Sequence, residues 1–281
     1  MFDEMSLQPE LTYDKHVDGV FGFEDLGSNQ RNFKLADHVL VFMVRGLGKK
    51  FKQPICYYYV QGTTKTFDLV QCIHQVVQSI LTTGLNLVAT LSDQGKTNVA
   101  TINILKRETS ISFLKQGLDN CIKGYIIDGH EVVHIYDPPH LLNNEDMGYR
   151  ALPKLTEEHV VIEKLRKMKV STSTQTLSHP PSNPDIGNNA LGTAAFCLFM
   201  DQCFDSENAA TRNAMDGKIL RSAVTSSSSH ITFWNTAIEV FKSMRFVHLN
   251  KQTNITKVST PLCVKNWIVT LRGFKYVWPK L

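Results

Sequence analysis

The residues best suited to chemistry lie between positions 87 and 105, where an apolar stretch is interrupted by Asp93 and then by Gly95-Lys96-Thr97. Such a segment can be a phosphate-binding loop, an acidic metal site at a strand end, or a simple turn. A Walker-type loop follows G-x-x-x-x-G-K-[ST], because its first glycine lets backbone amides surround the phosphates. Thr90 stands where that glycine is required. The triplet is therefore weak support for a nucleotide-binding loop around Lys96.

Two carboxylates offer a different chemistry. Asp93 follows a pattern typical of a buried strand, and Asp3 follows the apolar pair Met1-Phe2. Carboxylates at the ends of neighbouring strands can hold Mg²⁺, and two metal ions about 4 Å apart can drive phosphodiester chemistry. A single Asp after a strand is, however, more often the N-cap of the next helix. The residue types alone leave both interpretations open.

The elements that would position these carboxylates have the pattern of an α/β domain. Strands are expected at 19–27, 38–44, 54–60, 86–92 and 132–136, the last one stopping at Asp137-Pro138 because proline cannot continue the ladder. A helix with apolar residues from Phe67 to Leu81 should end at Gly84, and a second should carry Val99, Ile102 and Leu105. This succession predicts a mixed sheet, in which functional groups gather at strand carboxyl ends.

From about residue 146 the pattern becomes helical. Helices are expected at 157–169, at 194–205, at 232–244, and after Thr260 as N-cap with Pro261 in the first turn. Turn-forming residues indicate loops at 178–189 and 225–229. The second half should therefore be a separate, largely helical unit.

Composition limits the class of protein. No apolar run approaches the ~18 residues that a membrane span requires, and the six cysteines contain no CxxC pair with matching histidines. We expect an intracellular protein with reduced thiols and neither a structural zinc site nor a membrane partner. The net charge of +4 permits a nucleic-acid partner without arguing for one.

Several ordered blocks, taken together, resemble the P-element transposase family, which includes relatives with an N-terminal THAP zinc finger. The resemblance covers nearly the whole chain. The blocks are FDEMSLQPELTYD, GVFGFEDLG, HVLVFMVRGLGKKFKQPICYY, LVATLSDQGKTN, IYDPPHLL, PKLTEEHV, KMKVSTSTQTLS, TAAFCLFMDQCFDSEN and PLCVKNWIVTL.

This resemblance implies a cut-and-paste DNA transposase with two parts: an RNase H-like catalytic core, here residues 1–145, and a helical GTP-binding insertion, here 146–281. It also implies Mg²⁺ and GTP as cofactors, transposon-end DNA as partner, a nuclear location and a possible homo-oligomer.

The resemblance assigns roles to individual residues as well. Asp3 and Asp93 would be the first two metal ligands of the catalytic triad. Asp205 and Asn208 would read the guanine base: a carboxylate can accept from N1–H and N2–H₂, and an amide can donate to O6 or N7. Asp137 and His140 match a D-x-x-H signature, which either shapes the loop beside the site or is a proline-terminated strand end with a satisfied histidine.

The chain also departs from the family pattern. The third catalytic acid, a Glu, is expected on a core helix beyond PLCVKNWIVTL, and the sequence stops at Leu281 before such a helix. No THAP-like finger is present, and the step from His140-Leu141-Leu142 to Gly148 is short. We therefore expect a transposase fragment or domesticated remnant that does not cleave DNA alone. The alternative is a non-catalytic GTP-binding or protein-interaction module.

Overall fold

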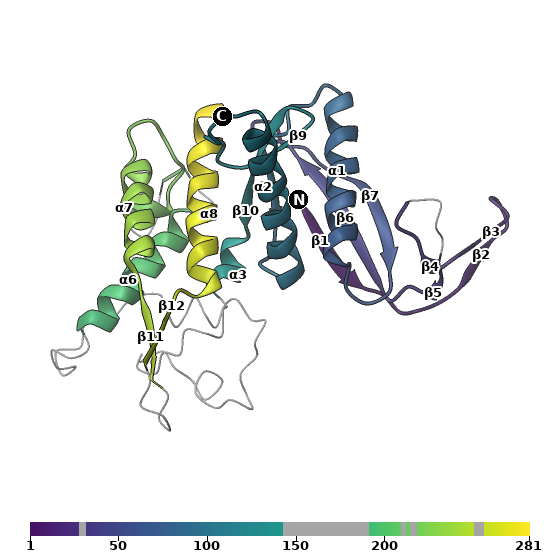
Figure 1. Cartoon of the computed structure of the whole chain (residues 1–281), viewed down its shortest axis with the longest axis horizontal. Helices are drawn as coiled ribbons and strands as arrows, with labels where there is room; N and C mark the ends of the chain where they lie inside the picture. The colour runs from purple at the N-terminus through teal and green to yellow at the C-terminus, as the bar shows by residue number, and fades with distance from the viewer. Residues whose placement is uncertain (28–31, 143–190, 209–211, 214–217, 250–255) are drawn as a thin grey trace. The chain divides into compact units, whose positions relative to one another are not determined.

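A computed structural model describes residues 1–27, 32–142, 191–208, 212–213, 218–249 and 256–281 (Figure 1). The chain divides into two compact units. The first comprises Met1–Ile135 with Tyr276–Leu281, and the second comprises Tyr136–Lys275. The expected helix at 157–169 and the expected loop at 178–189 lie outside the described residues.

The first unit contains two three-stranded sheets with the orders β1-β6-β7 and β8-β10-β9. Their strands are β1 (Phe2–Ser6), β6 (His38–Arg45), β7 (Lys52–Val60), β8 (Ala89–Ser92), β9 (Tyr125–Ile127) and β10 (His130–Tyr136). β6 is antiparallel to both of its neighbours and pairs Asp3 with Val41. The expected strands at 38–44, 54–60, 86–92 and 132–136 are confirmed in position, with ends that differ by a few residues.

Two short ladders join β1 to β6. They consist of β2 (Thr12–Asp14), β3 (Gly19–Phe21), β4 (Phe23–Glu24) and β5 (Asn32–Leu35), paired as β2-β3 and β4-β5. The expectation of one strand over 19–27 is wrong, because the chain breaks at Gly22. The φ of Gly22 is 112°, and a Cβ there would lie 2.0 Å from the carbonyl oxygen of Glu10. Only glycine adopts this conformation readily at so close an approach.

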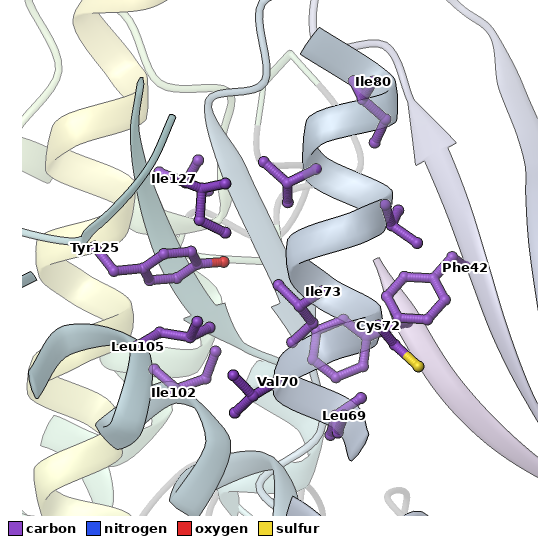
Figure 2. Close-up of a cluster of buried hydrophobic side chains, with 14 of the residues drawn as sticks. Phe42, Leu69, Val70, Cys72, Ile73, Ile80, Ile102, Leu105, Tyr125 and Ile127 are labelled. Carbon is purple, nitrogen blue, oxygen red and sulfur yellow. The ribbon is translucent and has the colours of Figure 1, made fainter. Parts of the chain in front are cut away.

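Helices α1 (Thr66–Thr82) and α2 (Lys96–Lys115) supply much of the first unit's core (Figure 2). α1 buries Leu69, Val70 and Ile73 among others, and each fully buried aliphatic side chain stabilises the fold by roughly 1.5–3 kcal/mol. Phe67 does not belong to this stripe: it is 74% exposed, because it lies on the other side of the first turn. The expected end of the helix is confirmed by Gly84, which has a φ of 79°.

The second unit contains four helices among its described residues, a 3₁₀ turn and a hairpin. They are α3 (Pro138–Leu142), α6 (Leu191–Asp205), η3 (Ile219–Arg221), α7 (His230–Ser243), β11 (Phe246–Leu249), β12 (Thr256–Ser259) and α8 (Leu262–Val277), after which comes η4 (Trp278–Lys280). The helices expected at 194–205, at 232–244 and after Pro261 are confirmed. The β11-β12 pair was not expected from the sequence.

Buried aromatic rings form the core of the second unit. Phe241 of α7 stacks on Trp267 of α8 with ring centroids 5.8 Å apart and an interplanar angle of 12°. Trp234 is buried as well, and its indole N–H donates to the Ser206 hydroxyl at 3.0 Å. Four of the six cysteines are buried, whereas Cys121 is exposed. None of the described helices is both long enough and apolar enough to cross a membrane.

Candidate functional site

Asp93 lies in the short connection between β8 and α2. Its Oδ1 accepts hydrogen bonds from the Gly95 backbone N–H at 2.9 Å and from the Asn98 side-chain amide at 2.5 Å. Gly95, two residues later, is the N-cap of α2, so Asp93 organises the approach to the helix without being its N-cap residue. Its Oδ2 has no hydrogen-bond partner among the described residues, and the side chain is half-buried. One carboxylate oxygen therefore stays available to a ligand.

Asp3 lies in β1 and is exposed. Its Oδ1 accepts from the backbone N–H of Glu4 at 2.9 Å, and its Oδ2 has no bond to a described residue. The residues on either side face the helices: Phe2 is in the core, and Glu4 accepts from the Thr64 backbone N–H at 2.8 Å. Because side chains alternate along a strand, Asp3 is directed to the opposite face of the sheet.

A buried histidine links the strands that carry these two aspartates. The His134 ring of β10 lies 6.4 Å from the Phe2 ring, and its Nε2 lies 3.4 Å from the Ser92 hydroxyl. β1 and β8 also contact each other directly. Asp3 and Asp93 thus each follow a residue that flanks the same imidazole. Alternation along β1 directs the Asp3 carboxylate away from that imidazole, whereas Asp93 lies just beyond the end of β8. Within the described part of the chain, no group of three or more metal-ligating side chains is assembled.

The surroundings of His134 keep it neutral. Its Nδ1 lies 2.9 Å from the Thr90 hydroxyl, which is 2.8 Å from the Tyr125 hydroxyl. Burial lowers the pKa of His134 well below its ordinary value, and the positive charges of Lys106 and the chain's amino terminus lower it further. Burial also raises the pKa of Tyr125. Sequence reasoning missed His134; the available signal was a histidine inside an otherwise apolar strand.

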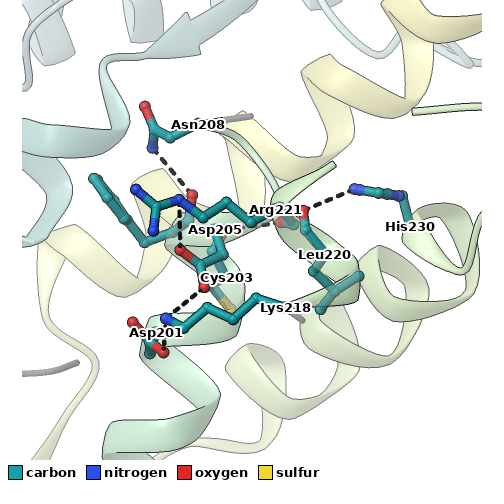
Figure 3. A network of polar contacts seen from close by, with 10 residues as sticks. Asp201, Cys203, Asp205, Asn208, Lys218, Leu220, Arg221 and His230 are labelled. Carbon is teal, nitrogen blue, oxygen red and sulfur yellow. Dashed lines mark hydrogen bonds and ion pairs between the residues drawn. The ribbon is translucent and has the colours of Figure 1, made fainter. Parts of the chain in front are cut away.

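A second polar cluster joins α6 to η3 in the second unit (Figure 3). Lys218 Nζ lies 2.7 Å from Asp201 Oδ2 and 2.8 Å from Asp205 Oδ2, and Arg221 Nε lies 3.9 Å from Asp205 Oδ1. Burial raises the pKa of Asp205; the bond from Lys218 opposes this shift, while the Asp201 charge adds to it. Both oxygens of Asp205 therefore face cations of the protein itself.

Asn208 lies close to this cluster in the chain, but its side-chain amide contacts Phe204 instead. α6 ends at Asp205, and the Asn208 side-chain amide donates to the Phe204 carbonyl at 3.0 Å. Between them lies Glu207, whose two carboxyl oxygens are buried without a hydrogen-bond partner among the described residues. Burial, and to a lesser degree the Asp137 charge, raises the pKa of Glu207 well above its ordinary value. The sequence interpretation had not selected Glu207.

The side chains of Asp137 and His140 approach each other across the first turn of α3. His140 Nε2 lies 3.5 Å from Asp137 Oδ2, and the His140 backbone N–H donates to the Asp137 carbonyl at 3.1 Å. Pro138 and Pro139 occupy the first turn, where a missing N–H costs little. The D-x-x-H segment thus begins where β10 ends, as expected at Asp137, and it continues into α3.

Comparisons with known proteins show which proteins this chain is similar to. Residues 1–106 match the family described as TNP-like, RNase H N-terminal domain. The Transposable element P transposase of Drosophila melanogaster is 26% identical over 239 residues, which cover 74% of this chain and 29% of that protein. The chain therefore spans less than a third of the length of this curated relative.

Among solved structures, the Drosophila P element transposase strand transfer complex matches with a TM-score of 0.66 at 20% identity, covering all of this chain and 64% of that one. This likeness shows a mixed α/β fold of the same type. By its sequence matches, the chain is P element transposase-like and carries a TNP-like RNase H N-terminal domain over residues 1–106.

Proposed function

We propose that this chain is a transposase-derived protein, with an incomplete RNase H-like core over residues 1–145 and a helical insertion over 146–281. In this proposal Asp3 and Asp93 are two ligands of a Mg²⁺ site. The observation that carries it is the shared contact of Phe2 and Ser92 with His134, which couples the strands behind both aspartates. DNA as partner and a nuclear location follow from the same transposase likeness.

The donor set fits magnesium. Mg²⁺ prefers hard oxygen ligands and is commonly held by one or two carboxylates together with water or phosphate oxygens. Asp3 and Asp93 each have one carboxylate oxygen with no bond to a described residue. A bound metal ion would supply charge stabilisation and activation of the attacking oxygen. With two carboxylates and no third one grouped with them among the described residues, we expect weak metal binding and no strand cleavage.

Strand cleavage and metal binding test this proposal separately. We expect no cleavage of a DNA duplex in Mg²⁺, and Mn²⁺ binding, followed by electron paramagnetic resonance, that falls in Asp93→Asn. Asp119→Asn is the matched control: it removes the same charge, and Asp119 is exposed. Robust cleavage abolished by Asp93→Asn would overturn the expected inactivity. Equal Mn²⁺ binding in wild type and Asp93→Asn would exclude Asp93 as a ligand.

A second candidate function is GTP binding near Asp205 and Asn208. Glu207 favours it, because buried carboxyl oxygens without hydrogen bonds are rare, and the N1–H and N2–H₂ groups of guanine are donors of the kind it lacks. Asp205 fits less directly: Lys218 already holds its Oδ2, so a guanine would have to share that carboxylate.

Calorimetric titration with GTP and ATP decides this candidate. We expect binding of GTP but not of ATP, weakened about five- to tenfold in Glu207→Gln, the scale of one lost hydrogen bond. Glu239→Gln is the control, since Glu239 is exposed on α7. Absence of heat with GTP, or equal affinity for the two nucleotides, would remove this function from consideration.

A further inference from the structure

The hairpin between β6 and β7 carries the most one-sided charge in the described part of the first unit. Residues 38–67 contain no Asp or Glu, whereas the tip contains Arg45, Lys49, Lys50 and Lys52. All four residues are exposed. Among the described residues, none of their side chains has an ion pair or hydrogen bond. The net charge of +4 is therefore unevenly distributed, and part of its excess is concentrated on one turn.

The pairing of the two strands makes this concentration energetically unfavourable in the free chain. Arg45 and Lys52 are direct partners across the antiparallel ladder. Like charges in that arrangement destabilise a sheet, commonly by a few tenths of a kcal/mol. Lys49 and Lys50 add two charges in the turn that joins them. A bound anion would remove this repulsion, which no described carboxylate relieves.

The turn is also built to hold a fixed shape. The Gly46 N–H donates to the Phe51 carbonyl at 3.0 Å, and the Phe51 N–H donates to the Lys49 carbonyl at 2.8 Å. A Cβ at Gly46 would lie 2.5 Å from the Lys49 carbonyl oxygen and 2.6 Å from the Phe51 ring. The backbone and the Phe51 ring therefore close tightly over the glycine. Lys49 and Lys50 project from a preorganised turn, which lowers the entropy cost of binding.

We propose that the β6-β7 tip, residues 45–52, binds the phosphate groups of duplex DNA. This inference rests on the DNA-handling function proposed above and adds a surface to it. Asp3 pairs with Val41, so Arg45 lies four residues farther along the ladder, about 13 Å at ~3.3 Å per residue. At ~3.4 Å per base pair this is roughly four base pairs. The tip would thus contact DNA that flanks the metal site.

Salt-dependent binding of the full chain to a fluorescent DNA duplex tests the proposal. Each phosphate contact contributes about 0.9 to the slope of log K against log salt. We expect Lys49→Gln/Lys50→Gln to lower that slope by about two and the affinity about tenfold near 0.1 M salt. Lys15→Gln/Lys34→Gln is the matched control: it removes the same charge from exposed positions on the β2-β3 and β4-β5 ladders, and should retain the wild-type slope.

Three outcomes would overturn the proposal: no DNA binding by the wild type, an unchanged slope in the hairpin variant, or an equal loss in the control. Binding to vesicles containing phosphatidylserine in place of DNA, with the same loss in the hairpin variant, would assign the tip to a membrane surface and also overturn it. Lys50→Gln alone, with an expected slope change of about one, replaces the double variant if that variant has a lower melting temperature. The Mn²⁺ titration of Asp93→Asn reports on the metal site independently.

Discussion

His134 is buried, and each of its ring nitrogens lies within hydrogen-bond distance of a hydroxyl group. Thr90 and Ser92 provide these partners from alternate positions of β8. A charged imidazole would have to remain in the core next to other positive charges. The residue that contacts both β1 and β8 is therefore also a pH-sensitive point of the fold.

We predict that this histidine makes the protein less stable in mild acid. The unfolded chain binds a proton at His134 near pH 6.5, whereas the folded chain, with its lowered pKa, does not. The unfolded state then binds more protons, so stability present at neutral pH is lost as the pH falls, by about 1 kcal/mol from pH 6.5 to 5.5. Urea unfolding at these two pH values measures it.

His134→Leu should lose this part of the pH dependence, because both hydroxyls keep another acceptor: the Val133 carbonyl for Thr90 and the Asp93 carbonyl for Ser92. His16→Leu, at an exposed position, should keep it. Equal pH dependence in wild type and His134→Leu would contradict this account.

At the scale of elements, Lys218 is the cation that contacts both carboxylates of α6 at the link to η3, while Arg221 lies farther from Asp205. Asp201 and Asp205 lie one helical turn apart, with side chains only 10% and 8% exposed, and Lys218 stands between them. Without Lys218, two mostly buried carboxylates would face each other. Lys218 therefore compensates the charge of two mostly buried carboxylates.

Lys218→Met should destabilise the second unit by about 3 kcal/mol, because removal of one partner leaves buried charge uncompensated. Lys242→Met offers a like-for-like comparison: its partner Glu239 is exposed, so the change should cost less than about 1 kcal/mol. Denaturant unfolding of both variants measures the difference. Similar losses for the two substitutions would show that the α6-η3 link does not rely on the buried pairs.

At the scale of the whole molecule, the elements predicted correctly from the sequence are those set by hydrophobic periodicity and by turn-forming residues. The α1 stripe, its stop at Gly84, the strand ends at Ser92 and Tyr136, and the start of α8 near Pro261 all depend on local signals. The break at Gly22 depends instead on a contact with Glu10 twelve residues earlier, which no local pattern reports.

The same distinction between local signals and contacts distant in sequence applies to the candidate site. Strand positions made Asp3 and Asp93 candidates, and the family resemblance selected them. His134 and Glu207 could not be selected from the sequence, because their importance comes from burial and from neighbours distant in sequence. The helix expected at 157–169 stays a prediction, as do the roles of Asp3, Asp93, Asp205 and Asn208.

The pairing of Arg45 with Lys52 makes ionic strength act in opposite directions on folding and on binding. Added salt screens the repulsion between these side chains, so the free hairpin gains stability as salt is raised. The same salt competes for DNA phosphates and weakens their attraction to the tip. Conditions that make the isolated protein easiest to handle are therefore those in which this surface would be least able to hold its partner.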